Sequence, residues 1–160
     1  MEEAWANFFS AQVGASSALL GLLFVGVSLN LPKILASPGL PNRALLALIL
    51  LLIVLILSLI FLVPNQGLRL LAVEVLFFAV LMLAVGTAIE ISLTKAARVL
   101  RKAYLLNFVL FELSALPYLV AGVLLAMGDA AGVYWLAAGM ILSIVKAVTE
   151  AWVLLVEINR

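Results

Sequence analysis

The sequence predicts an all-α, polytopic membrane protein in which residues 1–160 form one integral membrane domain of five transmembrane helices. The mean hydropathy is +1.35, and 68% of the residues are hydrophobic against 11% charged. A soluble domain of this size is about half apolar and about a quarter charged. A small globule has too much surface to hide such an excess of apolar residues, so the solvent is predicted to be lipid.

Five apolar stretches are each long enough to cross a bilayer, which takes about 20 mainly apolar residues. The first predicted helix covers about residues 8–31 and ends at Pro32, which cannot continue a helix, so a loop is expected from there to Arg43. One side of this helix is lined by small residues at spacings of three, four and seven, namely Gly14, Ser17, Gly21 and Ser28. Lipid supplies no hydrophobic force between helices, so close packing must hold them together. A face of small residues allows another backbone to come close enough for such packing. We therefore expect the other helices, or copies of this one, to pack around it.

The second predicted helix, at about residues 44–63, is uniformly apolar with Ser58 as its only polar residue. A helix of this kind is expected to face lipid on most sides. The sequence Pro-Asn-Gln-Gly at residues 64–67 is typical of a tight turn. The third helix is predicted at about residues 68–93 and carries Glu74 and Glu90.

The last two helices are predicted at about residues 104–127 and 133–156, with a Gly- and Asp-containing turn at residues 128–132 between them. The alternative is four spans, with one of the five stretches re-entrant.

The loops indicate an orientation, because Lys and Arg are enriched in cytoplasmic loops. The opposite loops and the N-terminus hold only Arg69. The loops after the first and third helices hold six cations, which are Lys33, Arg43, Lys95, Arg98, Arg101 and Lys102. The N-terminus is therefore predicted outside and the C-terminus inside. The acidic start of the chain is unlike a signal peptide, so the first helix is expected to be retained.

The fifth helix carries one continuous polar stripe, formed by Gly139, Ser143, Lys146, Glu150 and Glu157 at spacings of four, three, four and seven. Lys146 lies roughly 15 Å from the inner surface and Glu112 roughly 12 Å, at a rise of 1.5 Å per residue. Similar depth predicts a buried Glu112–Lys146 ion pair, with Glu150 as a second partner. Three interpretations remain open: the charges neutralise each other and fix the helix register, they line an ion path, or Lys146 extends its ammonium to the membrane interface.

Further polar residues lie inside the predicted spans. Glu90 is expected at the headgroup level beside Lys95 and Arg98, while Glu74 matches Gln12 in depth and is predicted to accept its hydrogen bond. Glu74 and Glu90 are sixteen residues apart and point to nearly opposite faces. Asn30 and Asn107 are expected to act as caps or as interhelical hydrogen-bond donors.

The sequence excludes several kinds of chemistry. It contains no Cys and no His, which removes thiol and imidazole nucleophiles and Cys/His metal sites. No metal-ligand spacing, Gly-rich phosphate loop or nucleophile elbow is present. No basic patch with interleaved aromatics indicates a nucleic-acid partner, and the net charge is only +1. We therefore expect a protein that is not an enzyme and that needs neither metal nor cofactor.

Residues 8–55 contain an aromatic pair, a Gly/Ala/Ser-rich run, Gly-Leu-Leu-Phe-Val at residues 21–25 and Ser28-x-Asn30. In this pattern the stretch resembles a family of small, uncharacterised bacterial integral membrane proteins. That family has no established catalytic residues, so none is transferred to this chain. A weaker analogy relates the first helix to the pore helix of Orai calcium channels, where Asn30 takes the place of the acidic ring.

Two functions of different class follow. Five short helices leave little room for an enclosed site in one subunit, so we expect a homo-oligomer in the bacterial inner membrane. In the first interpretation it is an ion channel lined by the first helix or by the stripe of the fifth, with an ion as its ligand. In the second it is a non-catalytic accessory that docks on another membrane complex.

Overall fold

Five long helices and one short helix make up the part of the chain that the structure, a computed structural model, describes. The backbone is described for residues 2–96 and 101–158, and the side chains for residues 4–94 and 105–157. The six helices are α1 (Glu2–Leu29), α2 (Leu31–Ala36), α3 (Leu40–Phe61), α4 (Leu68–Ala96), α5 (Arg101–Ala126) and α6 (Gly132–Ile158). All of them except α2 are long and apolar enough to cross a membrane. The all-helical prediction with five candidate spans is therefore confirmed.

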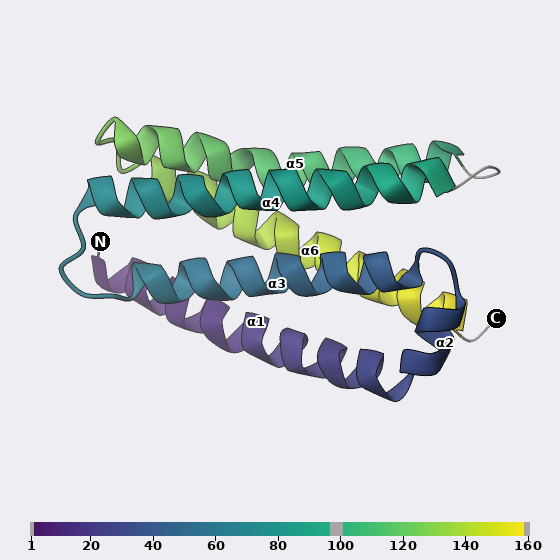
Figure 1. Cartoon of the computed structure of the whole chain (residues 1–160). Coiled ribbons are helices and arrows are strands. Elements are labelled where there is room, and N and C mark those ends of the chain that lie inside the picture. The colour runs from purple at the N-terminus through teal and green to yellow at the C-terminus, as the bar shows by residue number, and fades with distance from the viewer. Residues whose placement is uncertain (1, 97–100, 159–160) are drawn as a thin grey trace.

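The five long helices run alternately in opposite directions, as short turns between spans require (Figure 1). The N-terminus, the α3–α4 turn and the α5–α6 turn lie at one end of the molecule. The C-terminus and α2 lie at the other end (Figure 1). We call these the N-terminal end and the C-terminal end. An odd number of spans places the two termini at opposite ends.

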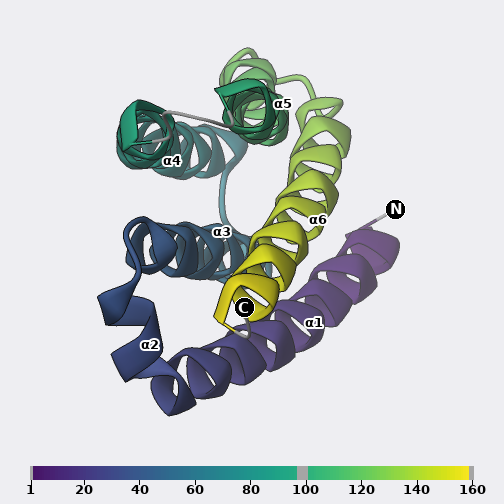
Figure 2. The ribbon, with the colours of Figure 1, turned by 90° about the vertical axis from the view of Figure 1, so that its right-hand side faces the viewer.

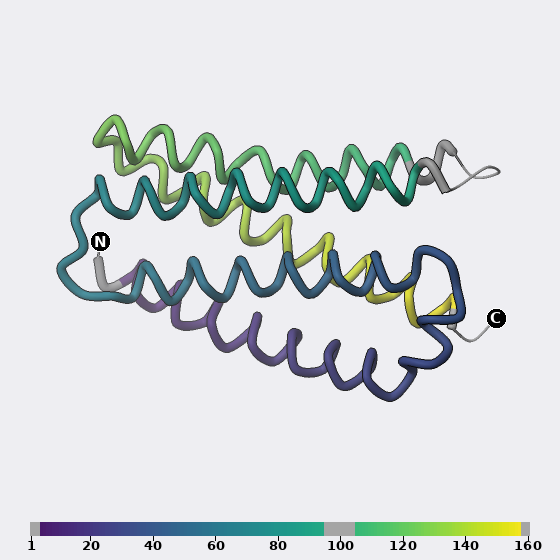
Figure 3. Tube along the Cα trace, viewed as in Figure 1, coloured from purple at the N-terminus to yellow at the C-terminus, as the bar shows by residue number. Residues whose placement is uncertain are grey.

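Four of the long helices form a closed ring, with α3 against α4, α4 against α5, α5 against α6, and α6 against α3. In Figure 2, α4 and α5 lie on one side of α3, and α1 lies on the other. The trace of α6 runs obliquely, from beside α5 at the N-terminal end to beside α3 at the C-terminal end (Figure 3). This ring gives a single subunit an interior into which side chains from four helices point.

The first helix lies outside the ring, and the prediction that the other helices of the chain pack around it is wrong. It packs mainly against α3. Gly14, Ser17, Gly21 and Ser28 are all exposed, and a Cβ added at Gly14 or Gly21 would meet nothing within 4 Å. The buried residues among the described part of α1 are instead Phe9, Gln12 and Ser16. Packing of copies of α1 against one another stays a prediction.

The centre of the molecule is α3, which we expected to face lipid. Half of the residues in the most apolar stretch of α3 are buried (50%), whereas only 11% are buried in the corresponding stretch of α1. Leu46, Leu50, Val54 and Leu57 are completely buried. A helix that is apolar all round can lie in lipid or at the centre of a bundle, so the missing polar face did not distinguish the two. Because α3 contacts α1, α4 and α6, it lies at the centre of the bundle.

The expected loop after the first helix contains a short helix. The first helix ends at Leu29, and α2 begins at Leu31 with Pro32 in its first turn. A proline fits there because the first amide N–H groups of a helix need no intrahelical acceptor. Arg43, placed in the loop by the sequence, lies in the first turn of α3, which starts four residues earlier than expected.

Aromatic rings fasten α1 to its neighbours at the N-terminal end. The ring centroids of Trp5 and Tyr134 are 4.9 Å apart, and those of Phe9 and Phe61 are 4.8 Å apart. These contacts join α1 to α6 and to α3. Aromatic rings are common at the boundary between membrane and water, so this end has the composition of a membrane interface.

Candidate functional site

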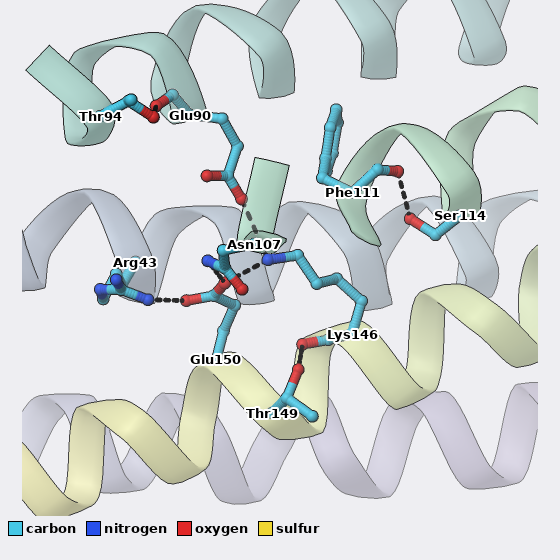
Figure 4. Close-up of polar contacts among 9 residues, drawn as sticks. All are labelled: Arg43, Glu90, Thr94, Asn107, Phe111, Ser114, Lys146, Thr149 and Glu150. Atoms are coloured by element: carbon cyan, nitrogen blue, oxygen red, sulfur yellow. Dashed lines mark hydrogen bonds and ion pairs between the residues drawn. The ribbon is translucent and has the colours of Figure 1, made fainter. Parts of the chain in front are cut away.

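Four charged side chains meet inside the ring near the C-terminal end (Figure 4). They are Arg43 of α3, Glu90 of α4, and Lys146 and Glu150 of α6, and we call them the charge cluster. Their exposed fractions are 9%, 0%, 3% and 1% in that order. All four belong to helices that are candidate membrane spans. The cluster therefore lies in an environment that water reaches little.

Lys146 is the centre of the cluster because it joins two carboxylates. Its Nζ donates to Glu90 Oε1 at 3.0 Å, which links α6 to α4. The same ammonium donates to Glu150 Oε1. Glu150 follows Lys146 by four residues, so the two side chains lie one above the other on one face of the helix. The stripe predicted on the fifth helix thus brings Lys146 and Glu150 together, as expected.

Glu150 receives the largest number of donors. Arg43 Nη1 donates to its Oε2 at 2.7 Å, and Asn107 Nδ2 donates to its Oε1 at 2.5 Å. Together with Lys146, these groups satisfy both oxygens from three helices. The four ionised groups sum to zero charge, as a buried set must nearly do, because an uncompensated charge in a low-dielectric interior is very costly.

Glu90 is held much less completely. Its Oε1 accepts one hydrogen bond, from Lys146. Its Oε2 is buried and has no hydrogen-bond partner among the described side chains. The two carboxylates of the cluster are therefore inequivalent, one saturated with donors and one half-satisfied.

Polar side chains continue from the cluster toward the N-terminal end. Ser143, one turn before Lys146, accepts a hydrogen bond from the Tyr118 hydroxyl at 3.0 Å. Beyond it, the Ser58 hydroxyl approaches Met140 Sδ at 3.9 Å. All three polar residues are completely buried. We call the charge cluster together with Ser143, Tyr118 and Ser58 the polar column.

The polar column crosses most of the bundle. Arg43 lies three residues after the start of α3, and Ser58 lies three residues before its end. At a rise of 1.5 Å per residue, these two side chains are separated by about 22 Å along the helix. Met140 is the apolar residue beside Ser58, so the column is interrupted there. The glycine of the predicted stripe serves close packing instead: a Cβ at Gly139 would lie 2.9 Å from Tyr118 Cε2.

The predicted pair of Glu112 with Lys146 is not formed. Glu112 is half-buried between α4 and α5, where the Thr87 hydroxyl donates to its Oε1 at 2.8 Å. Glu90 takes the place beside Lys146 that we assigned to Glu112. Glu90 is completely buried inside the ring, and its expected depth at the headgroup level stays a prediction. The side chains of Lys95, Arg98, Arg101 and Lys102 lie outside the described residues.

The predicted hydrogen bond between Gln12 and Glu74 is not formed either. Gln12 Nε2 and Glu74 Oε2 are both buried atoms without a hydrogen-bond partner among the described residues. Their helices, α1 and α4, lie on opposite sides of α3 (Figure 2). Asn30 Nδ2 donates to the Gly26 carbonyl at 3.0 Å at the end of α1, which is the capping role expected for Asn30 or Asn107. Asn107 makes the interhelical hydrogen bond, which is the other expected role.

Arg43, Ser58 and Tyr118 are the members of the column that the sequence did not predict as site residues. Arg43 follows Pro41 and Asn42 and stands at the edge of an apolar stretch, which is the usual setting of a loop cation. The sequence nonetheless indicated that Arg43 is helical. Pro is favoured in the first turn of a helix, and Pro41 lies two residues before Arg43. Tyr118 offers only a hydroxyl within an apolar run, and no pattern distinguishes it from a lipid-facing tyrosine.

The surface grooves differ in character from the polar column. A groove of about 480 Å³ between α1 and α3 is lined by Ser17, Gly21 and apolar side chains, and another groove lies between α1 and α6. Neither contains a residue of the charge cluster. The described residues include no group of three or more acidic, Cys or His side chains that would hold a metal ion.

Comparison with protein-family models, with curated proteins and with solved structures finds no match. The resemblance of residues 8–55 to small bacterial membrane proteins stays a prediction.

Proposed function

We propose that the protein is a multi-pass protein of the bacterial inner membrane that conducts ions along the polar column inside each subunit. The observation that carries this proposal is the burial of two carboxylates and two cations among candidate membrane spans. One ionisable residue at the centre of a spanning helix costs about 2.5–3.5 kcal/mol on insertion scales. Residues that are retained despite this cost commonly mark ion pathways and proton relays.

The competing interpretation is that the charges only fix the register of the helices. A register lock needs one paired cation and carboxylate. Three features favour a path instead: the cluster holds four charges, one carboxylate oxygen has no hydrogen-bond partner among the described side chains, and the polar residues extend to Ser58 near the opposite end. These features support a path inside the ring along the stripe of the fifth helix, which is one of the two linings that the sequence left open.

Ion flux into liposomes tests the proposal. Vesicles that contain the purified protein are expected to pass cations, and Glu150→Gln or Lys146→Ala should change the rate and selectivity because each alters the charge of the column. Glu112→Gln is the matched control, since Glu112 is an intramembrane carboxylate bonded to Thr87 outside the column. Tight vesicles that contain folded protein, or equal effects of all three substitutions, would contradict the proposal.

The second candidate function is that of a non-catalytic accessory, and the exposed face of α1 favours it. Gly14 and Gly21 leave open space for a neighbouring helix, and van der Waals contact across small residues is what holds helices together in lipid. The same face suits self-association into the expected homo-oligomer. Either occupant would cover Gly14, Ser17, Gly21 and Ser28.

The substitution Gly21→Leu tests this face. The bulky side chain should abolish the homo-oligomer or the co-purification of a membrane partner, while the protein still inserts and folds. Phe77→Leu is a control on α4, because Phe77 is 62% exposed on a different surface. An oligomer and a partner that both survive Gly21→Leu would show that this face is no interface.

A further inference from the structure

We propose that Glu90 is a proton-binding site, that its Oε2 takes up the proton, and that the proton is the ion carried by the polar column. Only the claim that the proton is the ion carried by the column rests on the proposed function. Proton binding at Glu90 is argued from the geometry of the cluster alone. Oε2 is a carboxylate oxygen inside a completely buried residue and has no hydrogen-bond partner among the described side chains. A buried acceptor of this kind is costly to leave unsatisfied.

Within the cluster, the distribution of donors selects Glu90 over Glu150. Glu150 is bonded to Lys146, Arg43 and Asn107. Lys146 and Arg43 act on both carboxylates, but each oxygen of Glu150 already accepts a hydrogen bond, whereas Glu90 Oε2 accepts none from the described side chains. The proton therefore has one open position in the cluster.

The groups that face Glu90 come from three helices. From α3 comes the guanidinium of Arg43, from α5 the amide of Asn107, and from α6 the ammonium of Lys146 and the carboxylate of Glu150. Glu112 of α5 is engaged with Thr87. With both carboxylates ionised the cluster is neutral, and protonation of Glu90 gives it one positive charge. Glu150 then becomes the sole anion of the four charged groups, shared by Lys146 and Arg43.

A metal cation does not fit this position. Lys146 Nζ already occupies the space between the two carboxylates, and Arg43 adds a second positive charge next to Glu150. A metal ion needs several oxygen ligands at about 2.0–2.6 Å, and the described residues offer no group of three acidic side chains. A proton needs one oxygen and almost no space.

Proton uptake changes one bond in the cluster. An O–H bond forms at Glu90 Oε2 while an O–H bond of a hydronium ion from the aqueous side breaks and leaves water, and no covalent bond of the protein breaks. The contact from Lys146 to Oε1 changes from an ion pair to a hydrogen bond with a neutral acid, which is the weaker kind. This contact is the cluster's tie between α4 and α6, so protonation loosens these helices from each other where the path must open.

Infrared difference spectroscopy between acid and alkaline pH tests the inference on the protein in vesicles. The carbonyl band of a protonated carboxylic acid should appear on acidification in the unaltered protein and in Glu112→Gln, and it should be lost in Glu90→Gln. Absence of the band from the unaltered protein, or its persistence in folded Glu90→Gln, would overturn the assignment.

A second variant covers the case in which Glu90→Gln fails to fold. Glu90→Asp keeps the carboxyl group but shortens its side chain, so it should shift the frequency of the band. An unshifted band would assign the proton to another group. The flux measurement separates the two proposals: a Glu90 band without flux rejects the ion path and keeps the proton site, while flux without the band rejects the proton site and keeps the path.

Discussion

The carboxylate of Glu150 connects three helices through its hydrogen bonds. It binds Arg43 of α3 and Asn107 of α5, and it shares Lys146 of its own helix with Glu90 of α4. Because charge-assisted hydrogen bonds are the strong ones, this end of the ring depends on a few polar contacts within an apolar core. Loss of any partner leaves a buried charge incompletely compensated.

Substitution of Arg43 tests whether it belongs to the core or to a loop. Arg43→Leu should lower the free energy of unfolding by about 3 kcal/mol, at the low end for breaking a buried ion pair because Glu150 keeps two other donors. Lys33→Leu is the control, because Lys33 lies exposed on α2 and should leave the stability unchanged. The measurement is unfolding of the purified protein in detergent. Equal stability of the two variants would mean that Arg43 does not contribute to the cluster.

The spacing of charged residues along one helix could be predicted from the sequence, but the neighbouring helix that each of them meets could not. A rise of 1.5 Å per residue placed Glu112 and Lys146 at similar depth, yet Glu112 turns toward Thr87 and Glu90 reaches Lys146. Periodicity within one helix fixes which residues share a face, as it did for Lys146 and Glu150. It says nothing about which neighbouring helix that face meets.

For the helices, composition predicts which stretches are long and apolar enough to span a membrane, but packing decides where each helix lies in the bundle. The five spans are visible in the sequence because length and apolarity define them. The sequence predicted α1 at the centre and α3 facing lipid, and the structure has the reverse arrangement. The prediction was wrong because it interpreted small residues as the sign of a central helix. In this subunit the centre is filled by the large aliphatic side chains of α3, and the small face of α1 lies on the outside.

Glycines on two helices should therefore respond in opposite ways to the addition of one methyl group. A Cβ at Gly86 of α4 would lie 2.0 Å from Phe111 Cζ, and Phe111 is completely buried. Gly86→Ala should cost about 1–3 kcal/mol through overpacking. Gly14→Ala on α1 meets open space and should be neutral or slightly stabilising, because Ala is the better helix former. Thermal unfolding of both variants checks this, and a larger loss at Gly14 would contradict the packing described.

At the scale of the whole molecule, the orientation in the membrane is open to a direct test. The cations outside the described side chains, together with Lys33 and Arg43, predict that the C-terminal end faces the cytoplasm. The chain has no native Cys, so single cysteines can report topology. A membrane-impermeant thiol reagent should label Asn65→Cys on intact cells and Lys33→Cys only after permeabilisation. The reverse pattern would place the N-terminus inside.

The ring of α3, α4, α5 and α6 encloses the polar column within one chain, whether or not copies of the chain associate. An oligomer would then hold one ion path per subunit. A pore on a shared axis would instead depend on all subunits at once. These two architectures predict different behaviour when active and inactive subunits are mixed.

The most direct test of the ion path is therefore the flux of vesicles containing mixed assemblies. Unaltered subunits are co-assembled in varied proportion with a variant of the charge cluster, Glu150→Gln or Lys146→Ala, that folds but is silent in the flux assay. A path inside each subunit predicts that flux falls in direct proportion to the fraction of variant subunits. A much steeper fall, in which one variant copy silences a whole assembly, would show that the path lies on an axis between subunits.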